Sequence, residues 1–128
     1  MTKRQSIYIE AFPHANPVPA ASRIGQMLYS GVIYGREGAT QQVPASLERQ
    51  CELMFGHLQS IVSAAGGTLD DVIKVTLWMV DKTQRAVVNP YWEALFPDAA
   101  SRPARHTLES TSSGNILIQC DFVAVLSD

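Results

Sequence analysis

The chain has 128 residues, of which 46% are hydrophobic and 17% are charged, and its formal net charge at pH 7 is -2. This length suits one domain with a single core, residues 1–128, and the low charged fraction favours a protein that hides part of its surface in an oligomer. The chain lacks the basic stripe of a nucleic-acid-binding protein, and no apolar run suits a membrane span or a signal peptide. We therefore expect a cytoplasmic protein without a nucleic-acid or membrane partner.

The N-terminal quarter predicts short strands around a proline-rich loop. Apolar and polar residues alternate over residues 6–11, which predicts a first strand. Residues 12–19 hold three prolines and predict an ordered loop, because proline has no backbone donor. Residues 22–26 predict a short strand and a bend, and residues 27–34 predict a continuous apolar strand. Gly31 inside that strand indicates a bulge, a close approach of another group or a local packing need.

Residues 44–65 predict an amphipathic helix, because apolar residues recur there at gaps of three and four. These residues are Leu47, Cys51, Met54, Leu58, Ile61 and Ala65. Pro44 suits the first turn of a helix, and Gly66 and Gly67 favour a stop after the last turn.

The cysteines and histidines show no spacing that is typical of a metal site. Cys51 and Cys120 both fall on the apolar faces of predicted elements, so we expect two buried free thiols. We interpret His14, in the proline-rich loop, as a surface residue, and His57, beside the apolar face of the helix, as a structural one. The sequence therefore predicts no metal.

Residues 72–80 predict a long strand whose two faces differ. One face is wholly apolar, is expected to meet the helix, and consists of Ile73, Val75, Leu77 and Met79. The other face is mixed and consists of Val72, Lys74, Thr76, Trp78 and Val80. A mixed face that carries a tryptophan and two valines is typical of a subunit interface.

Residues 84–96 predict a second helix. Its predicted contacts are Ala86, Asn89, Tyr91, Trp92, Leu95 and Phe96. Pro90 removes one backbone hydrogen bond, so this helix is either kinked or begins only there. Two helices can cover only one face of a sheet, and the sequence therefore predicts an α+β sandwich of two layers with a mixed sheet. The other sheet face needs a partner, for which closed cyclic assembly is the usual solution.

The C-terminal part of the chain predicts a hairpin. Its first strand follows a proline-punctuated turn in residues 101–109, and its second strand covers residues 115–126. Residues 112–115 are predicted to form the hairpin turn.

An arginine and an acid are carried on these two strands. Arg105, Thr107 and Glu109 share one face of the first strand, and Gln119 and Asp121 share one face of the second. An arginine and an acid that meet across a hairpin would suit a site for a small carboxylate. The alternative is that Arg105 forms only a surface ion pair, with the side chain of Glu109 or Asp121.

Several stretches of the sequence resemble the RidA/YjgF family. They are residues 28–31 (LYSG), 47–50 (LERQ), 64–76 (AAGGTLDDVIKVT), 88–89 (VN), 96–97 (FP) and 103–105 (PAR). The resemblance covers nearly the whole chain from Pro17 on. It implies a chorismate-mutase-like fold and a homotrimer, in which three sheets form a central barrel with clefts between neighbouring subunits.

The resemblance also implies a chemistry. The best-known members hydrolyse reactive enamines and imines, such as 2-aminoacrylate, to 2-keto acids and ammonia without a metal or an organic cofactor. In those members the arginine of the Pro-Ala-Arg motif binds the substrate carboxylate, and the matching residue is Arg105. Ser30, Gly31 and Asn89 also stand at matching positions and are expected to line the cleft.

Three expected site residues depart from the pattern of the deaminating members. Val18 stands in place of a tyrosine, Thr107 in place of a cysteine, and Gln119 in place of a glutamate that is proposed to position the water. Asp121, two residues further along the same face, is the second candidate for this task. A glutamine amide can orient a water molecule but cannot take its proton.

The sequence leaves two functions open. One is an enamine or imine deaminase that acts on a small 2-amino-2-enoate or imino acid, with a pathway-specific variant that acts on an aminomuconate-type intermediate. The alternative is a non-catalytic trimer that binds a keto acid or a similar small carboxylate. Ribonuclease activity, which is claimed for some members, is disfavoured by the negative net charge and the missing basic stripe.

Overall fold

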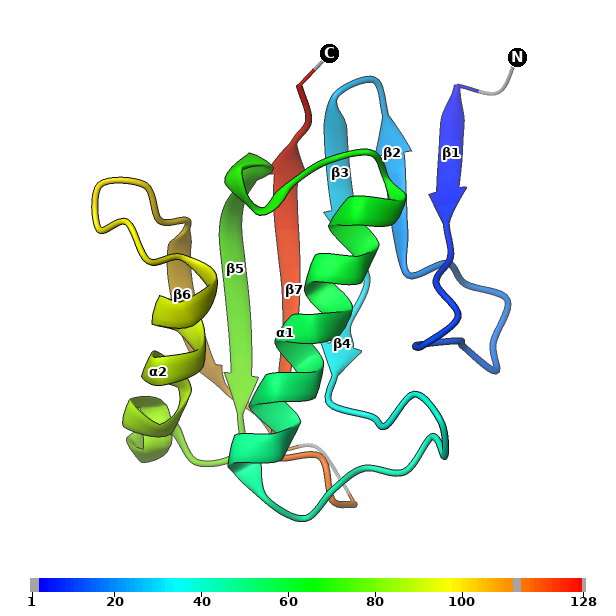
Figure 1. Ribbon diagram of the computed structural model, residues 1–128. Coiled ribbons are helices and arrows are strands. Elements are labelled where there is room, and N and C mark those ends of the chain that lie inside the picture. The colour runs from blue at the N-terminus through cyan, green and yellow to red at the C-terminus, as the bar shows by residue number, and fades with distance from the viewer. Residues whose placement is uncertain (1–2, 112–113, 128) are drawn as a thin grey trace.

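The computed structural model describes residues 3–111 and 114–127 and has two layers (Figure 1). Its elements are β1 (Arg4–Ile7), β2 (Ala21–Ile24), β3 (Met27–Ser30), β4 (Ile33–Tyr34), α1 (Leu47–Ala64), the short 3-10 helix η1 (Leu69–Asp71), β5 (Val72–Met79), the 3-10 helix η2 (Lys82–Gln84), α2 (Arg85–Leu95), β6 (Ala104–Glu109) and β7 (Ile118–Val125). Both α-helices lie on the same face of the sheet. The predicted α+β sandwich of two layers is therefore confirmed. In the described part of the chain, no helix is both long and apolar enough to cross a membrane.

The sheet is mixed, with the strand order β1-β2-β3-β7-β5-β6, and β4 also pairs with β7. Strands β5 and β6 run parallel to each other. The other pairs are antiparallel. The last strand of the chain, β7, therefore lies in the middle of the sheet, between β3 and β5.

The predicted C-terminal hairpin is wrong, because β5 lies between β6 and β7. Strands β6 and β5 end side by side, and just after β6 the backbone N–H of Ser110 donates to the carbonyl of Met79, the last residue of β5 (2.8 Å). The chain then passes to the other side of β5, where Val80 donates to the carbonyl of Leu117 (3.1 Å). Residues 112 and 113 of the predicted turn lie outside the described residues.

Helix α1 confirms the helix that the apolar spacing predicts. The hydroxyl of Ser46 accepts a hydrogen bond from the backbone N–H of Arg49 (3.0 Å), so the helix begins at Leu47 and not at Pro44. All six apolar positions that the spacing selects are buried. Gly66 follows the helix with a φ of 89°, a left-handed conformation that favours glycine.

Both cysteines are buried free thiols, as the sequence predicts. Burial, and then the negative charge of Glu48, raise the pKa of Cys51 to about 12. Burial also raises the pKa of Cys120, with smaller contributions from Asp121 and Cys51. Neither thiol is therefore suited to act as a nucleophile at neutral pH.

Strand β5 departs from strict alternation at its start. A register shift between Val72 and Lys74 inserts one residue into the pairing with β7. Val72 is consequently buried, with 6% of its surface exposed, whereas Ile73 is 56% exposed. The prediction that Ile73 faces the helix is wrong, and the prediction holds from Val75 onward.

Three other predicted elements have different limits. The first strand covers Arg4–Ile7 and not residues 6–11, and the chain beyond it places the buried side chain of Phe12 against the ring of His57 on α1. The continuous strand of residues 27–34 is split at Ser30, whose hydroxyl accepts from the N–H of Phe122 (2.8 Å) where a backbone carbonyl would otherwise pair. Helix α2 continues through Pro90 from Arg85, so it does not begin at the proline.

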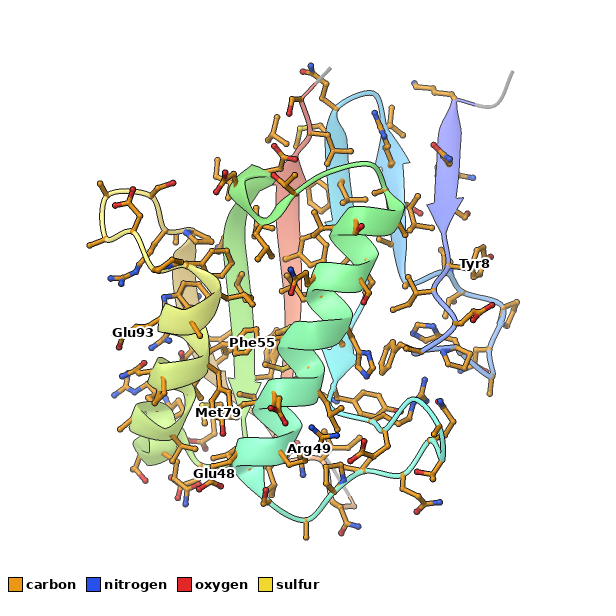
Figure 2. The ribbon with its side chains drawn as sticks, viewed as in Figure 1. Tyr8, Glu48, Arg49, Phe55, Met79 and Glu93 are labelled. Carbon is orange, nitrogen blue, oxygen red and sulfur yellow. The ribbon has the colours of Figure 1, made fainter. Side chains whose placement is uncertain are left out.

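In α2 the prediction that Ala86 makes contacts is wrong, because this residue is exposed. Val88, two residues later, is fully buried and was not among the predicted contacts. Trp92 and Phe96 are buried as expected, with ring centroids 4.8 Å apart. Phe55 of α1 points between the two helices toward Trp92, at a centroid distance of 6.3 Å (Figure 2).

One buried polar side chain joins three segments of the fold. Gln50 of α1 is fully buried. Its amide nitrogen donates to the carbonyls of Pro44 (2.8 Å) and Asn115 (2.7 Å), and its amide oxygen accepts from the N–H of Leu117 (2.9 Å). The backbone of Gly35 packs directly on the same residue, since a β-carbon at position 35 would lie 2.3 Å from the carbonyl oxygen of Gln50.

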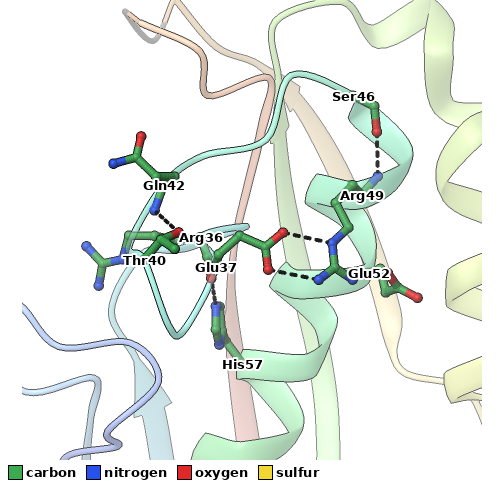
Figure 3. A network of polar contacts seen from close by, with 8 residues as sticks. All are labelled: Arg36, Glu37, Thr40, Gln42, Ser46, Arg49, Glu52 and His57. Atoms are coloured by element: carbon green, nitrogen blue, oxygen red, sulfur yellow. Dashed lines mark hydrogen bonds and ion pairs between the residues drawn. The ribbon is translucent and has the colours of Figure 1, made fainter.

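His57 fixes the loop that precedes α1 (Figure 3). Its Nε2 lies 2.7 Å from the carbonyl oxygen of Arg36, and its ring packs on Phe12 at a centroid distance of 5.0 Å. The guanidinium of Arg36 lies over the same Phe12 ring at 4.4 Å. On α1, Arg49 also holds this loop through two bonds to the carboxylate of Glu37 (3.0 and 2.8 Å). His57 is structural, as the sequence predicts.

This environment predicts that acid destabilises the protein. Burial and then the charge of Arg36 lower the pKa of His57, although its bond to the Arg36 carbonyl acts in the opposite direction. Burial and Arg36 also lower the pKa of His14, whose ring lies 5.1 Å from Phe12. Because the folded-state values lie below the ordinary value of 6.5, these histidines stabilise the fold fully above that pH and lose this contribution as the pH falls below it.

We expect the free energy of unfolding to fall between a pH of about 7.5 and about 5.5, as measured by urea denaturation. In His57→Gln, an amide can donate to the Arg36 carbonyl but does not titrate, so the decrease should be smaller. An equal decrease in both proteins would contradict a role for His57 in the acid response.

Candidate functional site

Arg105 lies on the helix side of the sheet, at its β6 edge. It pairs with Val75 in the parallel register of β5 and β6, and Val75 faces the core. Its Nη2 donates to the side-chain oxygen of Asn89 (3.0 Å), and its guanidinium lies 5.2 Å from the centroid of the Trp92 ring. Asn89 and Trp92 are three residues apart on α2 and therefore present one helix face to Arg105.

The guanidinium of Arg105 has neutral partners and no counterion. The two ion pairs within the described residues both belong to Arg49, so the predicted alternative of an ion pair with Glu109 or Asp121 is not formed. Nη1 of Arg105 is buried and has no hydrogen-bond partner. Burial, and then the positive charge of Arg85, lower the pKa of Arg105. A half-buried cation with a free donor is suited to bind an anion.

Gln119 and Asp121 lie on the opposite face of the sheet from Arg105. They pair with Trp78 and Thr76 of β5, on the face that the helices leave bare. The carboxylate of Asp121 accepts a hydrogen bond from the indole of Trp78 (3.0 Å). The expectation that an arginine and an acid meet across a hairpin is therefore wrong within one chain.

The other predicted site residues divide between two places. Thr107 is half-buried on β6, on the same side as Arg105, and Asn89 contacts Arg105 directly. Ser30 and Gly31 lie at the end of β3, where the N–H of Gly31 donates to the carbonyl of Ala20 (2.8 Å). Because β7 and β5 separate β3 from β6, these two groups are ~14 Å apart across the sheet.

Val18 is exposed in the proline-rich loop that leads to β2, on the β3 side of the sheet. Its N–H donates to the carbonyl of Asn16 (2.8 Å), which fixes this part of the loop. A single chain thus brings together Arg105, Asn89 and Thr107. It does not bring Val18, Ser30 and Gly31 to them.

A second arginine, which was not among the predicted site residues, lies on the same face of α2 as Asn89. Arg85 is the first residue of α2 and precedes Asn89 by four positions, so the two share a helix face. After burial, the positive charge of Arg85 is the second cause that lowers the pKa of Arg105. The only signal in the sequence is this spacing of four from a predicted site residue.

Two cavities of the single chain lie away from Arg105. One, of about 410 Å³, lies between α1, η1 and α2 and is lined by residues that include Gln59, Ser63, Thr68 and Leu95. Another, of about 350 Å³, is apolar and lies on the bare sheet face beside Ile24, Met27 and Tyr29. Within the described residues, no three histidine, cysteine, aspartate or glutamate side chains are grouped to hold a metal ion.

The bare sheet face is apolar over much of its area. Its exposed apolar residues on β2, β3 and β7 are Ile24, Met27, Tyr29 and Val125. From Lys74 onward the mixed face of β5, with Thr76 and Trp78, continues the same surface, whereas Val72, which was predicted to lie on it, is buried.

Comparisons with known proteins agree with this architecture. A family model described as Endoribonuclease L-PSP matches residues 8–125. A protein named 2-iminobutanoate/2-iminopropanoate deaminase, from Escherichia coli strain K12, is 32% identical over 88 residues, which are 67% of this chain and 69% of that protein. A RutC family protein from Pyrococcus horikoshii is 28% identical over 124 residues, which are 94% of this chain and 97% of that protein.

Solved structures are similar over nearly the whole chain. The E. coli YjgF gene product superposes with a TM-score of 0.85 at 27% identity, covering 94% of this chain and 98% of that one. E. coli TdcF with bound serine has the same fold, with a TM-score of 0.87 at 23% identity, and the match covers 96% and 99% of the two chains. From the match to residues 8–125 and these relatives, the chain belongs to the endoribonuclease L-PSP family, which is the YjgF/RidA family.

Proposed function

We propose that this protein is an enamine or imine deaminase that hydrolyses a small 2-imino acid to a 2-keto acid and ammonia. The observation that carries the proposal is the half-buried guanidinium of Arg105, which has an unpartnered Nη1 and no counterion among the described residues. A planar guanidinium can donate two parallel hydrogen bonds to a carboxylate, which fixes its orientation. The name of the E. coli relative at 32% identity supports the same reaction.

The reaction makes modest demands on the protein. A 2-amino-2-enoate tautomerises to an imine, whose carbon is electrophilic. Water adds to this carbon while one of its protons passes to the nitrogen. The hydroxyl proton of the tetrahedral adduct then also passes to the nitrogen, so that ammonia leaves and the keto group remains. With the carboxylate held by Arg105, the protein needs only to place the water and to assist these proton transfers.

The second half of the site is proposed to come from a neighbouring copy of the chain. Val18, Ser30, Gly31, Gln119 and Asp121 all lie away from Arg105 within one chain. The exposed apolar sheet face needs to be covered, and packing three such faces into a homotrimeric barrel would bring one chain's residues to the Arg105 edge of the next. In that cleft Gln119 would orient the water, with Asp121 as the nearest carboxylate.

The hydrogen bond that Asp121 already accepts favours a second function. The Asp121 carboxylate is engaged by the indole of Trp78, and Gln119 cannot accept a proton. A trimer that binds a small carboxylate without turnover is therefore the alternative to a deaminase. An aminomuconate-type substrate is a further variant of the first proposal.

One assay distinguishes these functions. A pyridoxal-phosphate dehydratase generates 2-aminoacrylate or 2-iminobutanoate, and semicarbazide traps the imine that survives. We expect the protein to shorten the lifetime of the imine, and sedimentation to give the mass of a trimer.

A binding protein would leave the lifetime of the imine unchanged and would still bind 2-oxobutanoate in a calorimetric titration. Failure of both measurements would refute the carboxylate site. A monomer in solution would refute the shared cleft.

A further inference from the structure

A second arginine stands beside the arginine that is proposed to bind the substrate carboxylate. Arg85 begins α2, and Asn89 lies one helical turn further along the same face. That face is directed at β6, since Asn89 accepts from Arg105 and Trp92 lies against the Arg105 guanidinium. The four residues from Arg85 to Asn89 span ~6 Å along the helix axis, so Arg85 is placed over the part of β6 that follows Arg105.

The positive charges of Arg85 and Arg105 act on each other. The charge of Arg85 is the second cause, after burial, of the lowered pKa of Arg105. A cation at the first residue of a helix also stands at the end of the helix dipole that favours anions. Both effects disfavour an arginine at this position in the empty site.

The neighbouring acids form no ion pair with either arginine within the described residues. In the part of the chain that the structure describes, the ion pairs are those of Arg49, and neither Arg85 nor Arg105 takes part in one. Asp81, before α2, accepts from the N–H and the hydroxyl of Thr83 (3.0 and 2.6 Å). Glu93 projects from the outer side of α2 (Figure 2). Glu109, on β6, makes no ion pair with either arginine.

Resting on the proposed function, we propose that Arg85 is a specificity-determining residue that binds a second negative group of the substrate. The preferred substrates are then imines of 2-keto acids that carry a second carboxylate a few carbon atoms from the first. Arg105 and Asn89 hold the carboxylate next to the reacting carbon, and Arg85 receives the distal one. A monocarboxylate leaves Arg85 in water and uses only the Arg105 half of the site.

The expected preference is modest and sensitive to salt, because the Arg85 side chain is exposed. Ion pairs between exposed groups contribute little, and dissolved salt screens them, so we expect about fivefold tighter binding of the dicarboxylate at low ionic strength. The preference should shrink as salt is added.

The test compares the stable keto acids 2-oxoglutarate and 2-oxobutanoate by calorimetric titration of the wild type, Arg85→Gln and Arg85→Lys. We expect the wild type to bind 2-oxoglutarate about fivefold more tightly than 2-oxobutanoate at low salt. Arg85→Gln should remove this ratio without weakening the binding of 2-oxobutanoate, and Arg85→Lys should restore most of it. Lys82→Gln removes the same charge three residues earlier and should keep the ratio.

The outcomes separate the two proposals. A wild type that binds both compounds equally, or an Arg85→Gln variant that loses affinity for both by the same factor, overturns the role of Arg85 and leaves the carboxylate site intact. Loss of the ratio in Lys82→Gln as well would assign the preference to general charge and would also overturn it. If neither compound binds, the carboxylate site is refuted and the role of Arg85 falls with it.

Discussion

Arg105→Ala is expected to weaken the binding of small carboxylates by about a hundredfold or more, which corresponds to the few kcal/mol of two charge-assisted hydrogen bonds in a partly dry cleft. Arg105→Lys should be intermediate, because an ammonium group keeps the charge but cannot donate two parallel bonds. Calorimetric titration with 2-oxobutanoate measures the affinity, and the imine-trapping assay measures turnover.

The same substitution should not destabilise the fold. Nη1 of Arg105 is buried without a partner, and burial and Arg85 disfavour the charged form of this residue. Removing this cation relieves the free-energy cost of burying a positive charge and an unpartnered donor. The melting temperature of Arg105→Ala should therefore be equal to or above that of the wild type.

Arg102→Ala is the matched control. Nε of Arg102 donates to the carbonyl of Phe96 (2.8 Å), and its Nη2 lies 3.4 Å from the carbonyl of Pro97. Its loss should lower the melting temperature and leave the affinity for 2-oxobutanoate unchanged. An Arg105→Ala variant that melts earlier but binds normally would show that Arg105 is a structural residue and not the carboxylate anchor.

Gln50→Ala is expected to lower the free energy of unfolding by on the order of 3–5 kcal/mol, a large share of the stability of a domain of this size. The substitution removes three part-buried hydrogen bonds, to Pro44, Asn115 and Leu117, and leaves these backbone groups without the partner that Gln50 provides. It also opens a cavity under the start of α1. Urea denaturation monitored by circular dichroism measures the change.

Gln50→Glu tests whether the hydrogen bonds or the volume of the side chain matter. A carboxylate could still accept from Leu117 but could not donate to Pro44 and Asn115, so this variant should also be strongly destabilised. Glu48→Ala, at an exposed position two residues earlier, should change the stability by less than about 0.5 kcal/mol. A loss below about 1 kcal/mol in Gln50→Ala would mean that water replaces the amide.

The sequence predicts those parts of the fold that depend on local periodicity. The spacing of Leu47, Cys51 and Met54 identifies α1 and its buried face, because a helix repeats its contacts within one segment. The pairing of β6 with β5 depends on contacts between distant segments, and alternation within a strand carries no information about its neighbour. The hairpin prediction failed for this reason.

Local irregularities were also beyond prediction. The register shift near Ile73 reverses the exposure of two residues, and alternation assumes that no such shift occurs. At Ser30 a side-chain hydrogen bond from the N–H of Phe122 replaces a backbone pairing. This bond depends on a strand that lies 92 residues later in the chain.

The arrangement of the candidate site was predicted in part. The Pro-Ala-Arg motif points to Arg105, and the structure places Asn89 beside it. The sequence could not place Gln119 and Asp121 on the opposite face, because that depends on the position of β5 between β6 and β7. It also could not single out Arg85, which we propose as a specificity-determining residue, since an exposed arginine at the start of a helix resembles any solvated charge.

The central position of β7 has a consequence for protein synthesis. Until the ribosome has added residues 118–125, the strands that can pair with one another form two separate groups, β1–β3 and β5–β6. Strands β3 and β5 then have open edges, which can pair with other chains. We therefore expect the sheet to close only once residues 118–125 have left the ribosome.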